Sequence, residues 1–226
     1  PRGKVWGGSS SINAMVYIRG NSYDYDLWRQ LGNTGWSYDD VLPYFKKAEN
    51  FQGDGDDEFH GFEGPLNVKK SSRTDDRLMD VFLEAGQEAG FPLTDDFNGK
   101  EQEGFSRYEH TMKDTTFGPR RWSAARAYLH PALKRKNLST ETNLQVNKIL
   151  FEGKKAVGIE YLKDGEIITC KSNKEIILSA GAINSPQILM NSGIGDSEEL
   201  KKHNISIVHE LKGVGKNLQD HYGVLN

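Results

Sequence analysis

The feature that most restricts the fold of this chain is the segment at 175–186, Glu-Ile-Ile-Leu-Ser followed by Ala-Gly-Ala-Ile-Asn-Ser-Pro. The aliphatic run Ile176–Leu178 lacks the alternation of a half-exposed strand and is typical of a parallel strand buried on both faces. Ser185 and Pro186 then form the pattern of a helix start, and Gly193 that of a helix end. A buried strand joined by small residues to a helix predicts an α/β fold.

Three short strands are predicted immediately before this segment. Apolar residues alternate over 146–151, 156–161 and 166–171, and turn-forming residues separate the three runs. Because the connections are short, we expect the strands to pair antiparallel as a small meander.

Helical periodicity dominates the first part of the chain. Apolar residues predict a helix over 12–18 and another over 78–89. Ser37 and Asp40 have the spacing of a capping box, which predicts a helix start. Pro43 is expected to open a new helical turn, because proline does not suit the middle of a helix.

Composition and charge exclude several classes of function. The net charge of −3 comes from interspersed acids and bases, so no nucleic-acid face is predicted. No apolar stretch is long enough to form a transmembrane segment, and a cytoplasmic or membrane-peripheral location is expected, with a mitochondrial one left open. The single cysteine, Cys170, excludes an internal disulfide. The six histidines show no metal-ligand spacing, so no metal is predicted.

A glycine-serine segment near the start of the chain has the chemistry of an anion site. Gly7 and Gly8 allow the backbone to approach a ligand, and Ser9 with free N–H groups at a helix start can surround a diphosphate. Asn13 follows one turn later and can point an amide toward the ligand. Composition alone favours a plainer reading, a capped helix after a flexible turn.

The longer pattern resembles the glucose–methanol–choline (GMC) oxidoreductase family, most closely its choline dehydrogenase-like members. The family's first signature is matched from Gly3 to Asp26, and its second from Gly181 to Gly195. Other stretches with the same resemblance lie at 36–49, 95–104, 120–129 and 213–221. The resemblance therefore covers essentially the whole chain.

This resemblance implies an FAD/NAD(P)-binding-type α/β domain with a small antiparallel β-meander, together with the beginning of an α+β substrate domain. Residues 1–70 and 112–226 are assigned to the FAD-binding domain, and residues 71–111 to the substrate domain. The chain begins at Pro1 and lacks the family's GxGxxG fingerprint, so we expect an internal fragment that lacks both termini.

The resemblance also implies a set of FAD contacts in the glycine-serine segment. Gly7, Gly8 and Ser9 would lie along the diphosphate and ribityl chain. Asn13 and Ala14 would lie beside the isoalloxazine ring.

A second set of contacts is implied later in the chain. The backbone of Val146 would hold the adenine, and Ala180 and Gly181 would pass close to the cofactor where the predicted strand ends. The stretch around His221 is expected near the flavin. Some family members bind FAD covalently through a histidine in the glycine-serine motif, but Ile12 occupies that position here, so non-covalent FAD is predicted.

The activity implied by the resemblance is oxidation of a primary alcohol, choline or a similar one, to the aldehyde by hydride transfer to flavin N5. The electron acceptor stays open among a quinone, an electron carrier and oxygen. The family's catalytic histidine is expected beyond Asn226, so no catalytic residue is assigned and residues 1–226 alone are expected to be inactive. The alternatives are a hydroxynitrile lyase-like member and a non-catalytic flavin-binding member.

Overall fold

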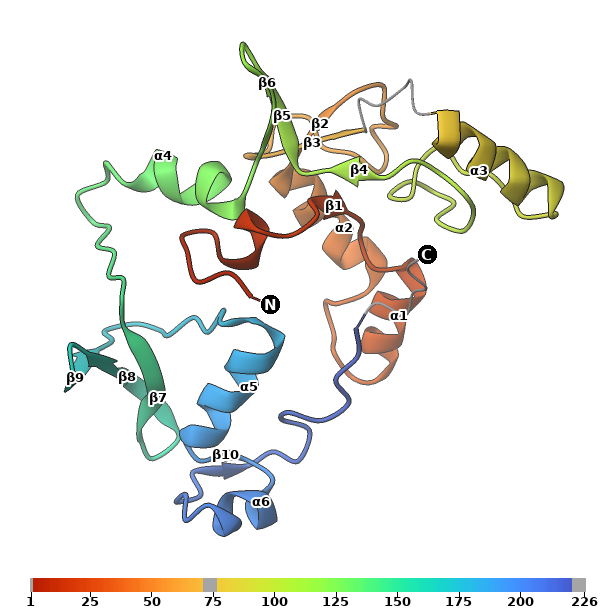
Figure 1. Cartoon of the computed structure of the whole chain (residues 1–226). Coiled ribbons are helices and arrows are strands. Elements are labelled where there is room, and N and C mark those ends of the chain that lie inside the picture. The colour runs from red at the N-terminus through yellow and green to blue at the C-terminus, as the bar shows by residue number, and fades with distance from the viewer. Residues whose placement is uncertain (1, 71–76, 221–226) are drawn as a thin grey trace. The chain divides into compact units, whose positions relative to one another are not determined.

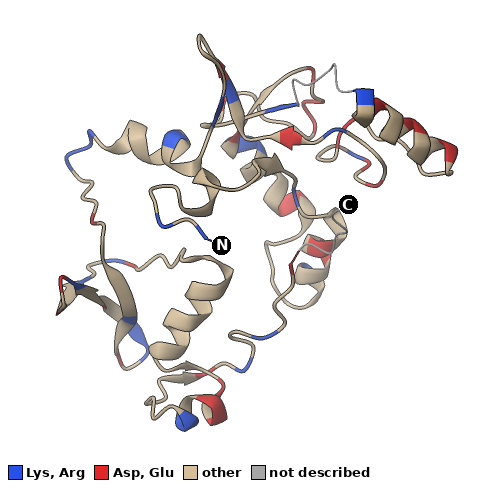
Figure 2. Cartoon of the chain, in the orientation of Figure 1, with Lys and Arg blue, Asp and Glu red and all other residues tan. Residues whose placement is uncertain are grey.

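The computed structural model describes residues 2–70 and 77–220. The chain divides into two compact units, Pro1–Ser139 (unit 1) and Thr140–Asn226 (unit 2) (Figure 1). Acidic and basic residues are present on both units (Figure 2). No helix among the described residues is long and apolar enough to cross a bilayer.

Unit 1 combines short helices with a small mixed sheet. Its helical elements are η1 (Gly8–Ser11), α1 (Ser22–Gln30), α2 (Tyr38–Ala48), α3 (Arg77–Glu88), η2 (Ala125–Leu129) and α4 (His130–Ala132). Its strands are β1 (Val16–Tyr17), β2 (Glu49–Gln52), β3 (Leu66–Lys70), β4 (Glu109–His110), β5 (Met112–Thr115) and β6 (Gly118–Arg121). The order β1-β4-β3-β2 makes a four-stranded sheet, and β5 and β6 form a separate hairpin.

Strand β1 lies where the sequence predicted a helix over residues 12–18, and that prediction was wrong. The short helical turn η1 ends at Ser11, and Met15 has a left-handed φ of 67°, which excludes a continuous helix through this segment. Val16 then pairs antiparallel with His110, and Thr111 N donates to Met15 O at 2.8 Å. Pairing with a distant strand overrides the local periodicity of a few apolar residues.

The start of α2 confirms the predicted capping box. Ser37 Oγ accepts from Asp40 N at 3.3 Å, and Asp40 Oδ2 accepts from Ser37 N at 3.0 Å. Pro43 lies inside α2, so the expectation that it opens a new turn was wrong. At the sixth helical position it removes the hydrogen bond to the Asp39 carbonyl, and the turns on either side continue. The predicted helix over 78–89 is also confirmed, as α3.

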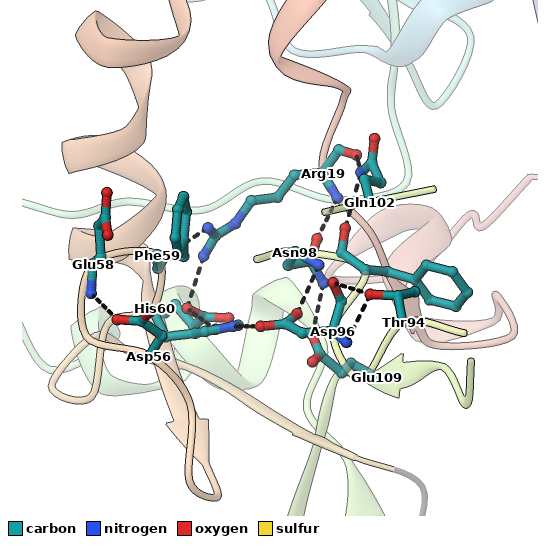
Figure 3. A network of polar contacts seen from close by, with 12 residues as sticks. Arg19, Asp56, Glu58, Phe59, His60, Thr94, Asp96, Asn98, Gln102 and Glu109 are labelled. Carbon is teal, nitrogen blue, oxygen red and sulfur yellow. Dashed lines mark hydrogen bonds and ion pairs between the residues drawn. The ribbon is translucent and has the colours of Figure 1, made fainter. Parts of the chain in front are cut away.

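A network of buried polar and ionisable side chains lies in unit 1 (Figure 3). Glu49, His60, Glu109 and Arg19 are 0%, 1%, 2% and 6% exposed. Arg19 Nη2 donates to Glu49 Oε2 at 2.8 Å, and His60 Nδ1 lies 3.1 Å from the same oxygen. His60 Nε2 lies 2.7 Å from Asp96 Oδ2 on the other side of the ring. The imidazole therefore bridges two carboxylates.

Asn98 joins this network to strands β1 and β4. Its Oδ1 accepts from Arg19 N at 2.7 Å, and its Nδ2 donates to Tyr17 O at 3.1 Å and to Glu109 Oε2 at 2.6 Å. One amide thus bonds to the backbone at the end of β1 and to a side chain of β4. The segment that supplies this bridge lies between α3 and β4. The irregular structure expected for residues 92–121 was wrong for 109–121, which contain β4, β5 and β6.

The network shifts the pKa values of its members. Burial alone would lower the pKa of His60, but hydrogen bonds to Asp96 and Glu49 outweigh it and raise the pKa from 6.5 to about 9. Burial raises the pKa of Glu109 from 4.5 to about 7. Burial opposes ionisation of Asp96 too, but the hydrogen bond from His60 prevails and lowers its pKa. At neutral pH the imidazole of His60 therefore carries a proton, and Glu109 becomes neutral as the pH falls below about 7.

Unit 2 is built on the predicted meander. The sheet β7-β8-β9 consists of β7 (Gln145–Glu152), β8 (Lys155–Lys163) and β9 (Glu166–Lys171), paired antiparallel. The remaining elements are α5 (Gly181–Asn191), β10 (Ile194–Gly195), α6 (Ser197–Lys202) and β11 (His209–Glu210). Ser192 Oγ, just after α5, accepts from Ile149 N at 2.8 Å and ties the helix to β7. The meander prediction is confirmed.

The strand predicted at 175–179 does not form. These residues have no regular structure, and Ile177 is 79% exposed. A strand buried on both faces needs flanking strands, and no described strand pairs with this segment. Helix α5 also begins at Gly181, earlier than the predicted Ser185, and Ser185 Oγ instead accepts from Ala180 N at 3.0 Å. The assignment of 1–70 with 112–226 and of 71–111 to separate domains stays a prediction.

We predict that unit 1 loses stability as the pH rises from 5 to 8. Glu109 has a folded pKa above its ordinary value, so its contribution is complete below about pH 4.5 and is lost as the pH passes about 7. The Glu109→Gln substitution keeps an uncharged hydrogen-bonding group. The unfolding free energy of wild type should fall by on the order of 3 kcal/mol over this range, and the Glu109→Gln variant should lack this fall.

Denaturant unfolding at a series of pH values measures this effect. Glu88→Gln, at an exposed position of α3, is the matched control and should keep the wild-type slope. Equal slopes for wild type and Glu109→Gln would show that Glu109 does not titrate in this range. His60, whose pKa is raised from 6.5 to about 9, should add a further loss between about pH 6.5 and 9 in all three proteins, so the difference in slope between wild type and Glu109→Gln reports Glu109.

Candidate cofactor-binding site

Two adjacent glycines shape the glycine-serine segment and play different parts. Gly7 and Gly8 have left-handed φ values of 87° and 53°. A Cβ on Gly7 would lie 2.6 Å from Ser11 Oγ and 3.1 Å from Ala125 N, so this glycine is needed for packing. A Cβ on Gly8 would meet nothing within 4 Å. Gly8 is therefore where a ligand can approach the bare backbone.

The three consecutive serines also differ in their contacts. Ser10 Oγ donates to Gly7 O and accepts from Ala124 N at 3.0 Å, and Ser11 Oγ donates to Trp6 O at 2.7 Å. Ser9 Oγ accepts a longer bond, 3.3 Å, from Gly3 N. Ser10 and Ser11 hold the loop together, which leaves Ser9 as the serine best able to contact a ligand.

A segment more than a hundred residues later supports the loop. Arg121, the last residue of β6, donates from Nη1 to Ser10 O at 3.2 Å and to Asn13 Oδ1 at 2.7 Å. Ala124 N and Ala125 contact the loop at Ser10 and Gly7, as described above. The sequence reasoning assigned no role to Arg121. Only the family-like stretch at 120–129 signalled that this region matters.

Asn13 and Ala14 follow the loop directly and are exposed. Asn13 Oδ1 accepts from Met15 N at 3.1 Å as well as from Arg121. The structure thus places Gly7, Gly8, Ser9, Asn13 and Ala14 on one short segment that β6 supports.

A cavity of about 400 Å³ lies beside this segment. Its lining residues are Trp6, Ser11, Arg120, Arg121, Ser123, Ala125, Arg126 and His130. Three of these are arginines and none is acidic, so the cavity favours a negatively charged ligand. One short segment thus carries an open left-handed glycine, Gly8, and contributes Trp6 and Ser11 to an arginine-lined cavity, and both features suit the diphosphate of a dinucleotide cofactor.

The other predicted cofactor contacts belong to unit 2. Val146 lies in β7 opposite Tyr161, next to an irregularity in the strand. Ala180 is the N-cap of α5, and Gly181 has a left-handed φ of 88° with open space where a Cβ would be. Gly181 therefore resembles Gly8 in presenting open backbone at the start of a helix. His221 lies outside the described residues.

The buried network contains three groups in a metal-like arrangement. Ligand atoms of His60, Asp96 and Glu109 lie within 4.8 Å of one another. Both ring nitrogens of His60 are already bonded to carboxylates, so the ion pairs account for the cluster without a metal. We interpret His60 as a structural residue, and no metal is proposed.

Comparison with known proteins identifies the family. The GMC oxidoreductase family model matches residues 1–223. This chain belongs to the GMC oxidoreductase family. The family prediction made from the two signature segments is confirmed, and so is the α/β fold class.

Several relatives of this GMC oxidoreductase chain are choline dehydrogenases. It is 52% identical over 221 residues to mitochondrial choline dehydrogenase of Homo sapiens, an alignment that covers 98% of this chain and 36% of the human protein. It is 51% identical over 224 residues to the oxygen-dependent choline dehydrogenase of Brucella anthropi, covering 99% of this chain and 40% of that protein. The chain therefore spans about two fifths of the length of the curated relatives it matches.

Solved structures give the same result for the fold. An FAD-dependent oxidoreductase from Chaetomium thermophilum superposes with a TM-score of 0.89 at 34% identity, covering 97% of this chain and 39% of that one. Pyridoxine 4-oxidase from Mesorbium loti superposes with a TM-score of 0.83 at 32% identity, covering 92% and 40%.

We predict that the two glycines of the loop respond differently to alanine. Gly7→Ala places a methyl group against Ser11 and Ala125 in a left-handed conformation, and should lower the unfolding free energy by about 2–4 kcal/mol. Gly8→Ala has space for its methyl group and should lose only about 1 kcal/mol, the cost of its φ.

Thermal and denaturant unfolding without added flavin measure this difference. Gly213→Ala is the control, because its Cβ would meet nothing and its φ is not left-handed. A loss for Gly8→Ala as large as that for Gly7→Ala would mean that Gly8 is packed and unavailable to a ligand.

Proposed function

We propose that this chain is part of an FAD-dependent oxidoreductase that oxidises a primary alcohol to its aldehyde. The observation that carries the proposal is the open, left-handed backbone at Gly8, on a segment that also lines an arginine-rich cavity. It occurs in a chain that is about half identical, over nearly its whole length, to choline dehydrogenases. Bound FAD supplies the acceptor for the hydride of the alcohol.

Residues of unit 1 bind and orient one part of the cofactor. The backbone at Gly7 and Gly8, with Ser9, lies along the diphosphate and ribityl chain, where the side chains of Arg120 and Arg126 offset its negative charge. Asn13 and Ala14 lie beside the isoalloxazine ring. In unit 2 the backbone of Val146 binds the adenine, and Ala180 with Gly181 lines the cofactor at the start of α5.

Choline or a similar primary alcohol is the proposed substrate, because relatives at about 50% identity are named choline dehydrogenases. The structural relatives include a pyridoxine 4-oxidase and a fungal aryl-alcohol oxidase, so one fold and cofactor serve different alcohols. No residue of 1–226 is assigned as the base that removes the hydroxyl proton. The acceptor of the electrons is a quinone, an electron carrier or oxygen, and the proposed location is cytoplasmic, membrane-peripheral or mitochondrial.

We expect choline to bleach the oxidised flavin of the intact protein when the two are mixed anaerobically. The visible absorption of oxidised flavin disappears when a hydride is transferred, and betaine aldehyde should appear in equal amount. Tetramethylammonium is the matched control, since it has the same cationic head without a hydroxyl group and should leave the spectrum oxidised.

The outcome also separates the alternatives. Bleaching by other primary alcohols and not by choline would keep the alcohol oxidation and replace the substrate. Cleavage of a cyanohydrin with the flavin still oxidised would identify a lyase. A flavin that responds to neither class of compound would identify a non-catalytic flavoprotein.

We also predict that FAD is held without a covalent bond. Ile12, at the position that a tethering histidine occupies in some family members, has no nucleophilic atom. After acid precipitation of the intact holoprotein, the supernatant should be yellow and the pellet colourless. A pellet that stays yellow and fluoresces on a denaturing gel would contradict this prediction and would point to a tether elsewhere.

A further inference from the structure

We propose that Arg121 is a positioning residue that fixes the side-chain amide of Asn13, so that its Nδ2 donor faces the flavin ring. This inference rests on the proposed function. It assigns to a residue of β6 a task that neither the glycine-serine motif nor the family resemblance gave to it.

Two obligatory donors fix the orientation of the Asn13 amide. Arg121 Nη1 lies 2.7 Å from Oδ1, and Met15 N lies 3.1 Å from the same atom. A guanidinium and a backbone N–H can only donate, so the atom facing them must be the carbonyl oxygen. If the amide were flipped, Nδ2 would face both Arg121 Nη1 and Met15 N, and no hydrogen bond could form between two donors. The amide nitrogen is therefore on the side away from both partners.

The Nδ2 group is left available to a ligand. Asn13 is exposed, and Nδ2 makes no hydrogen bond with the residues that the structure describes. A fixed donor beside the isoalloxazine ring stabilises the reduced flavin more than the oxidised flavin, because reduction adds electron density to the ring. The orientation of Asn13 should thus affect the flavin's reduction potential.

Arg121 is held firmly enough for this task. It ends the β5–β6 hairpin, where it pairs with Met112. The next residue, Trp122, donates from its backbone N to Thr111 O at 2.8 Å and from Nε1 to Pro65 O at 2.8 Å. A donor anchored on paired strands positions its partner better than one on a free loop.

The test uses the intact holoprotein with Arg121→Met, Arg121→Lys, Asn13→Ala and the double variant Arg121→Met/Asn13→Ala. Arg135→Met, at an exposed arginine of unit 1, controls for the loss of one positive charge. The measurements are the FAD content, the reduction potential of the bound flavin, and kcat and KM for the alcohol.

Arg121→Met should retain FAD but bind reduced flavin about tenfold less tightly relative to oxidised flavin, which lowers a two-electron potential by about 30 mV. The kcat should fall about tenfold with KM within about twofold of wild type. Asn13→Ala should show the same shift, and the double variant no more than either single one, because both changes remove one oriented donor. Arg121→Lys should fall between wild type and Arg121→Met.

Three results would overturn the inference: an unchanged potential in Arg121→Met, additive shifts in the double variant, or loss of FAD from Arg121→Met but not from Asn13→Ala. The last two would mean that Arg121 acts on the cofactor directly. If Arg121→Met does not fold, an unchanged potential in Asn13→Ala overturns the inference by itself. Failure of the proposed function is distinct, since wild type would then lack FAD or fail to oxidise any alcohol.

Discussion

The buried carboxylate of Glu49 is the constraint on which unit 1 depends. A charge with no exposure is tolerated only with partners, and its partners come from separate segments: Arg19 follows β1, and His60 lies in the loop after β2. His60 also bonds to Asp96, and Asn98 bonds to Glu109 of β4, so both segments belong to the same network. These contacts therefore fix the positions of β1, β2, β4 and the segment between α3 and β4 relative to one another.

Two sets of contacts fix the position of the glycine-serine segment. Downstream, the chain passes from Asn13 through Met15 into β1, whose far end the Arg19 network holds. From the side, Arg121 at the end of β6 bonds to Ser10 and Asn13, and the segment after β6 bonds to Ser10 and packs against Gly7. These contacts use the packed side of the loop and leave the Gly8 side open. A loop built in this way can bind a large anionic cofactor without first having to order itself.

Local signals in the sequence predicted the elements that local interactions determine. The capping box at Ser37, the helix before Gly90 and the three strands of the meander depend on neighbours within a few residues, and all are confirmed. The predictions of a helix at 12–18 and of a strand at 175–179 were wrong because both depend on pairing with distant strands. Val16 pairs with His110 of β4, and no described strand pairs with 175–179. The signatures indicated the cofactor class, but the contact between Arg121 and Asn13 joins residues 108 positions apart. Periodicity and composition carry no trace of such a pair.

The network also explains how so short a strand as β1 keeps its register. Only two residue pairs, Val16 with His110 and Tyr17 with Glu109, join β1 to β4, and a slip of one residue would turn every side chain to the opposite face. Glu109 belongs to one of these pairs, Arg19 lies two residues beyond the end of β1, and both bond to Asn98. A slip would leave buried charges without partners, at a cost of about 3–5 kcal/mol for each broken ion pair. An apolar cluster of similar volume would tolerate the same slip far more easily. The charges therefore contribute less to net stability than to the choice of one register, and that choice sets where Asn13 lies.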